Sequence, residues 1–342
     1  MTHFSSMIPH RFSPKTLIAP ALLSATLLGC GNNADLDEYG DPVATDIPHV
    51  AVTQIVEHPA LDAVRDGVQD KLKEEGYEAD SSLKWEWESA QGQAANAAQI
   101  AQKFVGDSPD LIVAIATPSA QAVVGNTDTI PVVFSAVTDP VGAELVPSLE
   151  ASGGTVTGVS DLSPIDEHLA LIADISPEAK TIGVIYNAGE SNSVSLVELL
   201  KLEAAAQGFT LEEATVSSSA DVVTAAESLV GKVDAIYVPT DNTVVSALES
   251  VLKVGNDNQI PVFAGDTDSV ERGAIATASF DYYEVGRQTG DMVARILSGE
   301  NPGDIPVELA NTVDLAVNLT AAAAMGVAIP DVIKNSADQV FE

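Results

Sequence analysis

At residues 49–62 the chain contains the sequence HVAVTQIVEHPALD. Its first part, His49–Val56, is short and rich in Val, which predicts a buried β-strand. Pro59 follows a polar loop and suits the first turn of a helix, so we expect a helix over Leu61–Glu75. A strand that leads through a polar loop into a helix is the repeating unit of an α/β protein.

The same alternation of short apolar runs and helix-period stretches continues along the chain. Two series of strands are expected: His49–Val56, Leu83–Ala90, Leu111–Ala116, Ile130–Ala136 and Val156–Ser160, then Thr181–Tyr186, Thr210–Val216, Ala235–Val238, Pro261–Ala264 and Ala274–Ser279. Further helices are expected over Ala94–Phe104, Ser193–Gln207, Ala220–Val230, Val244–Val254 and Tyr283–Leu297. This pattern predicts an α/β fold of two doubly wound parallel-sheet lobes joined by a hinge.

The division between the lobes is expected near Asp161, where Ser163 and Pro164 can start a helix. The tail after Ser279 is too short for a third domain, so we expect it to cross back and complete both lobes. Lobe 1 is then predicted to comprise 48–161 plus 281–306, and lobe 2 to comprise 162–280 plus 307–342.

The N-terminal segment, residues 1–30, has the features of a targeting signal. Arg11 and Lys15 precede an apolar stretch that is too short to cross a membrane. The stretch ends in LLGC and resembles a bacterial lipobox, which predicts lipidation of Cys30; the alternative is an ordinary secretion signal with an incidental cysteine. Residues 31–47 are polar and acidic, which indicates a flexible tether. A lipid-anchored protein in the periplasm or at the cell surface is expected, on either the inner or the outer membrane.

The composition excludes several classes of function. The chain has 50 acidic and 15 basic residues and a formal net charge of −35, which disfavours nucleic-acid binding. Cys30 is the one cysteine, and two of the five histidines lie in the signal. No dinucleotide fingerprint, phosphate loop or Gly-x-Ser-x-Gly elbow is found. We therefore expect no catalytic residue, metal or cofactor.

Parallel sheets bind ligands beyond the carboxyl ends of their strands, and in lobe 1 these ends carry hydroxyl-rich loops. Hydroxyl groups and the N–H groups at helix starts can hold a carboxylate without an arginine. The candidate ligand-binding residues of this lobe are Gln54, His58, Thr117, Ser119, Ala120, Ser135, Ala136, Thr138 and Asp139.

In lobe 2 the corresponding loops carry carboxylates, which suit a positively charged ligand group but are also good helix caps. The candidates here are Glu190, Asn192, Ser193, Thr240, Asp241, Asn242 and Asp266, with Asp281 and Tyr282 where the chain crosses between the lobes. Tyr282 can either stack on a flat ligand or pack within the hinge.

As an ordered set, these segments resemble the tryptophan/tyrosine-type substrate-binding lipoproteins of ABC transporters. The resemblance is carried by 54–62, 90–93, 117–121, 137–143, 186–193, 239–242 and 281–283, with Gly286 and Gly290. It implies a type I periplasmic-binding-protein fold that closes on an aromatic amino acid, namely tryptophan, tyrosine or phenylalanine. It also implies a monomer with a permease and an ATPase as partners.

By analogy with amino-acid binders of this fold, one group of side chains would hold the ligand carboxylate: Thr117, Ser119, Ser135 and Thr138. Glu190, Asp241 or Asp266 would hold its ammonium group. One alternative is the same fold with a sugar, nucleoside or signalling ligand, although an aromatic content of 5% and few arginines disfavour sugars. Another is an enzyme of similar architecture, which turnover of a candidate ligand would reveal.

Overall fold

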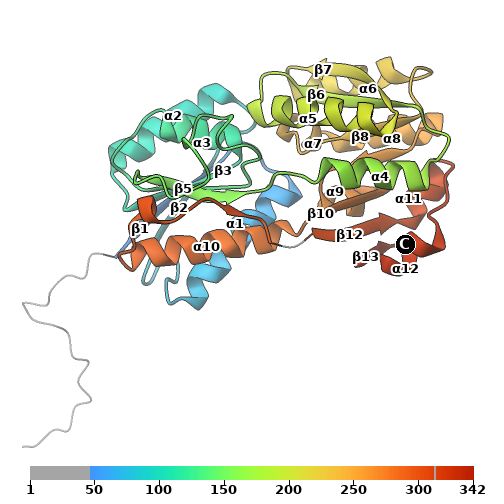
Figure 1. Ribbon diagram of the computed structural model, residues 1–342. Coiled ribbons are helices and arrows are strands. Elements are labelled where there is room, and N and C mark those ends of the chain that lie inside the picture. Colours follow the sequence, from blue (N-terminus) through green and yellow to red (C-terminus); the bar gives the residue numbers. More distant parts are fainter. Residues whose placement is uncertain (1–46, 312) are drawn as a thin grey trace, which may run out of the picture. The chain divides into compact units, whose positions relative to one another are not determined.

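The computed structural model describes residues 47–342 apart from residue 312 (Figure 1). The expected signal, the lipidation site Cys30 and nearly all of the expected tether therefore lie outside the described residues. Within the described part, parallel sheets are covered by helices, which confirms the expected α/β class. No helix in this part is both long and apolar enough to cross a membrane.

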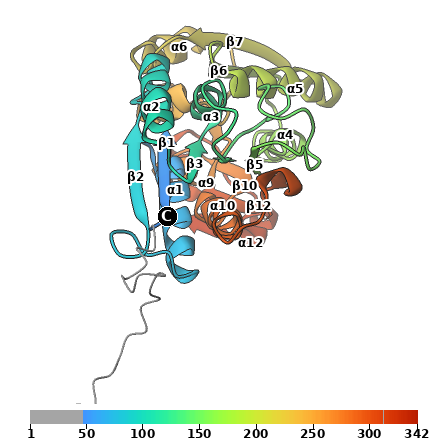
Figure 2. The same cartoon turned by 90° about the vertical axis from the view of Figure 1, so that its left-hand side faces the viewer.

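The first sheet has six strands in the order β11-β5-β4-β3-β1-β2, and every neighbouring pair is parallel. These strands are β1 (His49–Gln54), β2 (Lys84–Ser89), β3 (Leu111–Ile115), β4 (Val132–Ser135), β5 (Val156–Ser160) and β11 (Glu308–Leu309). α1 (Pro59–Glu74) and α10 (Tyr282–Leu297) lie side by side on one face (Figures 1 and 2). α2 (Ala94–Asp107) and α3 (Thr117–Val124) pack together on the other face. We call the residues of these elements lobe 1.

The second parallel sheet has four strands in the order β7-β6-β8-β9. They are β6 (Thr181–Asn187), β7 (Thr210–Val216), β8 (Ala235–Val238) and β9 (Val262–Ala264). α4 (Ile165–Ile175) packs with α5 (Ser191–Gln207), and α6 (Val222–Leu229) packs with α8 (Leu248–Asn258). Because crossovers between parallel strands are right-handed, the two pairs of helices lie on opposite faces of the sheet. The short α7 (Asn242–Val245) precedes α8, so the helix expected over Val244–Val254 is divided in two.

A third sheet completes the second half of the chain and departs from the all-parallel expectation. β10 (Ala276–Phe280) is antiparallel to β12 (Val313–Asn318), which is parallel to β13 (Gln339–Phe341). α9 (Thr267–Arg272), α11 (Leu319–Ala324) and α12 (Asp331–Ser336) accompany it. We call these elements and those of the second parallel sheet lobe 2.

Each lobe has its own hydrophobic core. In lobe 1 the whole of β1 is buried, as its apolar sequence predicts. The pairing of β11 with β5 extends lobe 1 to Leu309, past the expected boundary at residue 306. In both lobes the cores fix the strands, so that the loops at their carboxyl ends are held in place to form a site.

Candidate functional site

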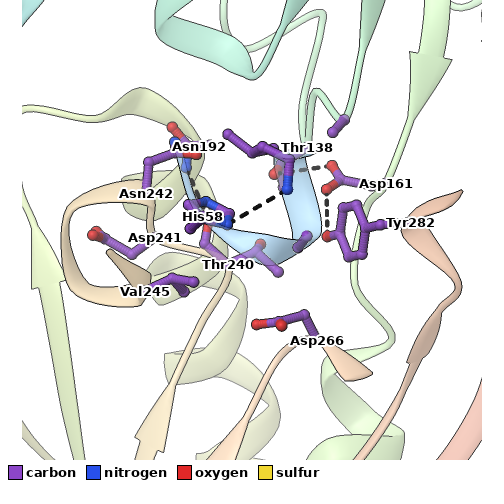
Figure 3. A pocket seen from close by; sticks show the side chains of 13 residues that line it. His58, Thr138, Asp161, Asn192, Thr240, Asp241, Asn242, Val245, Asp266 and Tyr282 are labelled. Atoms are coloured by element: carbon purple, nitrogen blue, oxygen red, sulfur yellow. Dashed lines mark hydrogen bonds between the residues drawn. The ribbon is translucent and has the colours of Figure 1, made fainter. Parts of the chain in front are cut away.

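A cavity that is partly open to solvent is lined by residues of both lobes, and about 340 Å³ in and around it is not filled by protein atoms (Figure 3). Every lining segment lies at or just beyond the carboxyl end of a strand or in the helix turn that follows. The residues are His58, Ala60 and Leu61 after β1, Ala136 and Thr138 after β4, Asp161 after β5, Asn192 after β6, Thr240, Asp241, Asn242 and Val245 after β8, Asp266 after β9, and Tyr282 after β10.

Three buried carboxylates dominate the charge of this cavity. The exposed fractions of Asp161, Asp241 and Asp266 are 3%, 0% and 2%. Burial raises the pKa of all three, and burial together with the nearby carboxylate of Glu190 raises the pKa of Asp241 to about 7. Removal from water disfavours the charged form of a carboxyl group, and a cation placed among these groups would reverse that effect. The cavity is therefore suited to a positively charged ligand group.

Asp241 is bound mainly by donors of its own lobe. Its Oδ1 accepts from the N–H of Val244 at 2.8 Å, which caps α7. Its Oδ2 accepts from the N–H of Asn187 and from Oγ of Ser193, each at 2.6 Å. Because a carboxylate offers about four acceptor positions, Asp241 has little capacity left for a ligand.

Asp161 and Asp266 each keep about half of that capacity. Asp161 accepts from Tyr282 Oη at 2.7 Å and from Thr138 Oγ1 at 3.3 Å. Asp266 caps α9 by accepting from the N–H and from Oγ of Ser269, both at 2.7 Å. These two carboxylates are consequently the better candidates for an ammonium group.

Three further polar atoms in the cavity lining have no hydrogen-bond partner within residues 47–342: His58 Nε2, Asn192 Oδ1 and Thr240 Oγ1. Buried polar groups are normally paired, so a cluster of unpaired ones indicates a binding site. Burial and the positive charge of Arg272 lower the pKa of His58 to about 3, and the side chain of Asn242 partly opposes this decrease. His58 is therefore neutral at physiological pH.

Ala136 shows that the backbone is constrained at this edge of lobe 1. It lines the cavity with a φ of 53°, and Ala116, at the end of the neighbouring β3, has a φ of 72°. Non-glycine residues seldom adopt such values, and those that do are concentrated at functional sites.

Half of the eighteen residues predicted from the sequence line the cavity: His58, Ala136, Thr138, Asn192, Thr240, Asp241, Asn242, Asp266 and Tyr282. The other nine do not: Gln54, Thr117, Ser119, Ala120, Ser135, Asp139, Glu190, Ser193 and Asp281. Conversely, the sequence interpretation omits Ala60, Leu61, Asp161 and Val245. Asp161 follows the strand-end rule used for the others, whereas Ala60, Leu61 and Val245 carry no polar signal.

Thr117, Ser119 and Ser135, which were expected to hold the ligand carboxylate, do not line this cavity. All three side chains are buried, and the hydroxyl groups of Thr117 and Ser119 have no hydrogen-bond partner among the described residues. Ser135 Oγ is hydrogen-bonded at 2.7 Å to Oγ1 of Thr289 on α10, because β4 lies under that helix. Ala120 is likewise buried in the helix α3.

Glu190, expected to bind ammonium, is satisfied instead by the first residues of α7. It accepts from the N–H and Nδ2 of Asn242 at 3.2 and 2.6 Å, and from the N–H and Oγ1 of Thr243 at 3.1 and 2.6 Å. Glu190 therefore joins the loop after β6 to the start of α7.

Four more predicted residues make contacts of a structural kind. Gln54 donates to Val56 O and to Asp62, and Ser193 donates to Asp241. Asp281 caps α10. Asp139 accepts from the N–H of Gly142 and, across the lobes, from Ser195 Oγ at 3.1 Å.

Comparison with known proteins gives a consistent picture. The family model described as ABC transporter substrate binding protein matches residues 49–341. A tyrosine-binding protein of Clostridioides difficile is 40% identical over 327 residues, which cover 95% of this chain and 93% of the relative.

Two solved structures are similar over almost their entire length. A conserved domain protein from Vibrio cholerae is 53% identical with a TM-score of 0.85, and the match covers 86% of this chain and 99% of that one. An ABC domain from Streptococcus pneumoniae, solved in complex with L-Trp, is 37% identical with a TM-score of 0.83 and the same coverage.

Proposed function

The chain belongs to the ABC transporter substrate-binding protein family, and from this premise we propose that it captures an aromatic amino acid, tyrosine or tryptophan. The relative from Clostridioides difficile is a tyrosine-binding protein, and the Streptococcus pneumoniae structure holds L-Trp.

The type I periplasmic-binding-protein fold expected from the sequence is confirmed. Membership places the chain in an ABC transport system, outside the cytoplasm. We propose a permease and an ATPase as its partners, and a lipid anchor at Cys30.

The observation that carries the proposal is a pair of carboxylates that can each accept further hydrogen bonds and that line the same cavity as several apolar side chains. Asp161 and Asp266 have room to accept hydrogen bonds from an ammonium group. Leu61, Val245 and the ring of Tyr282 supply apolar surface for an aromatic side chain. An aromatic amino acid presents both features on one small molecule.

Ligand entry requires the lobes to separate, because the residues that line the cavity are almost fully buried. Thr138 and Asp161 are each 3% exposed, and Tyr282 is equally buried. We therefore propose a hinge movement in which the ligand stabilises the closed arrangement by contacts to both lobes. We propose capture alone and no chemical conversion.

Calorimetric titration with L-tyrosine, L-tryptophan, L-phenylalanine and a set of sugars tests this proposal. We expect Kd values of about 1 μM or lower for tyrosine or tryptophan. Saturable binding of a sugar with no binding of any aromatic amino acid would contradict it.

The Asp266→Asn variant tests the role of the carboxylate. Asn caps helices as well as Asp does, so the fold should be retained while the charge is lost. We expect affinity for the amino acid to fall about 10- to 100-fold, as for loss of a hydrogen bond to a charged group. Asp257→Asn is the control, because Asp257 on α8 is exposed and does not line the cavity, and it should change affinity less than about 3-fold. Equal effects of the two variants would remove Asp266 from the site.

A further inference from the structure

We propose that the imidazole of His58, together with the first turn of α1, binds the ligand carboxylate and thereby selects amino acids over the corresponding amines. This inference rests on the proposed function and deepens it. It assigns the carboxylate to a place other than the Thr117, Ser119 and Ser135 cradle expected from the sequence.

The position of His58 fixes which ring nitrogen carries the proton. His58 is the N-cap of α1, and its Nδ1 accepts from the N–H of Leu61 at 3.5 Å. In a neutral imidazole with one accepting nitrogen, the other nitrogen is the donor. Nε2 is therefore an N–H group, and it is buried without a hydrogen-bond partner among the described residues.

The other donors of the cavity lining are nearly all engaged. Thr138 and Tyr282 donate their hydroxyl hydrogens to Asp161. The side-chain amide of Asn192 donates to Thr240 O, and that of Asn242 donates to Glu190. Among the lining side chains that the structure describes, His58 Nε2 and Thr240 Oγ1 make no hydrogen bond, and the Asn242 amide keeps a second N–H beyond the one it donates to Glu190.

The start of α1 adds a second, independent attraction for an anion. Ala60 and Leu61, in its first turn, line the cavity, and this helix has 16 residues. Pro59 has no N–H, the Leu61 N–H donates to His58 Nδ1 and the Asp62 N–H donates to His58 O, so the Ala60 N–H is the first-turn donor left for an anion at the positive end of the helix dipole. Asp161, Asp241 and Asp266 would repel a carboxylate wherever they are charged. The ligand is therefore expected to direct its carboxylate to α1 and its ammonium group to the acids.

Two substitutions separate the capping role of His58 from the donor role. His58→Asn retains a good N-cap but is too short to place a donor where Nε2 lies. His58→Gln can place an amide N–H near that point, at the expense of the cap. Thermal unfolding of both variants without ligand reports whether the fold is retained.

The test compares the binding of L-tyrosine with that of tyramine, which lacks the carboxylate. Both ligands are titrated calorimetrically into the unchanged protein and into each variant, and the affinity of the weaker ligand is measured by competition with L-tyrosine. We expect His58→Asn to weaken L-tyrosine about 10- to 100-fold and tyramine less than about 3-fold, and His58→Gln to restore part of the difference. Thr240→Val should reduce the preference for L-tyrosine less than His58→Asn does.

Three results would overturn the assignment: equal loss of both ligands in His58→Asn, no loss in that variant, or a larger effect of Thr240→Val. In each of these cases binding of L-tyrosine by the unchanged protein would leave the proposed function intact. Failure of the unchanged protein to bind any of the twenty amino acids would instead overturn the proposed function and the carboxylate subsite together.

Discussion

At the scale of single residues, two buried histidines show how hydrogen bonding separates structural from binding roles. Both ring nitrogens of His168 are paired, Nδ1 with Tyr237 Oη and Nε2 with the carbonyl oxygen of Ala278, each at 2.7 Å. His58 is similarly buried but has one nitrogen unpaired in the cavity. His168 therefore joins α4 to β8 and β10, whereas His58 has a donor available for a ligand.

His168 should make the stability of the protein depend on pH. Burial lowers its pKa to about 4 from 6.5, so the unfolded chain binds a proton at a higher pH than the folded one. The stabilisation is complete above about pH 6.5 and is lost as the pH falls towards 4. Between pH 7 and pH 5, the free energy of unfolding of the parent should fall by about 2 kcal/mol more than that of His168→Gln. Urea titration at the two pH values measures this difference. Parallel pH profiles for the variant and the parent would refute this.

The sequence could locate the loops of the site but not the direction of each side chain. Strand-end carboxylates at positions 190, 241 and 266 are equivalent in sequence, yet Glu190 caps α7 and Asp266 faces the cavity. That difference depends on where the loop after β6 meets the loop after β8, which is a tertiary contact. Asp161 could have been found by the same strand-end rule, but the interpretation of 161–164 as a junction left it out.

At the scale of elements, the close packing of α1 against α10 depends on glycines. A Cβ added to Gly286 would overlap with the carbonyl oxygen of Val64, and one added to Gly67 would overlap with that of Tyr283. Both contacts are to backbone atoms, which cannot move aside without shifting a helix. The two helices form one face of lobe 1, so their spacing also positions His58 and Tyr282 at their N-terminal ends.

Gly286→Ala should therefore destabilise the protein by on the order of 3 kcal/mol, because the helices must separate. Gly106→Ala is the matched control, since a Cβ at this helical position in α2 meets nothing within 4 Å. Alanine is the better helix former, so the control should gain about 0.5–1 kcal/mol. Chemical denaturation measures both changes, and a Gly286→Ala variant as stable as the parent would show that the helices are not tightly packed.

Most elements could be predicted from the sequence because their patterns are local. The expected strands over Val156–Ser160, Thr210–Val216 and Ala235–Val238 have the bounds observed. The short strands β11 and β13 were not predicted, because two or three residues become a strand only through a partner distant in sequence. The antiparallel pairing of β10 with β12 likewise depends on the return of the tail to lobe 2.

At the scale of the whole described molecule, binding and closure are expected to be coupled. The cavity has walls from both lobes, and Ser195 on α5 donates to Asp139 in the connection between β4 and β5. Neither of these two residues lines the cavity. Their hydrogen bond therefore stabilises the closed arrangement independently of which ligand is bound.

Ser195→Ala should weaken every ligand by the same factor, about 2- to 10-fold, because it removes one inter-lobe hydrogen bond. The change should be in the dissociation rate, which stopped-flow fluorescence can measure for L-tyrosine and L-tryptophan. Ser228→Ala is the control, since Ser228 bonds only to Ala225 O within lobe 2. A factor that differs between the ligands would indicate direct contact with the ligand instead.

A crystal structure of the protein grown with L-tyrosine is the most direct measurement of the central claim. The account predicts one amino acid between the lobes, with its ammonium nitrogen within hydrogen-bond distance of Asp161 or Asp266 and its carboxylate beside His58 at the start of α1. An amino acid bound elsewhere, or bound in the cavity without contact to either of those carboxylates, would contradict it.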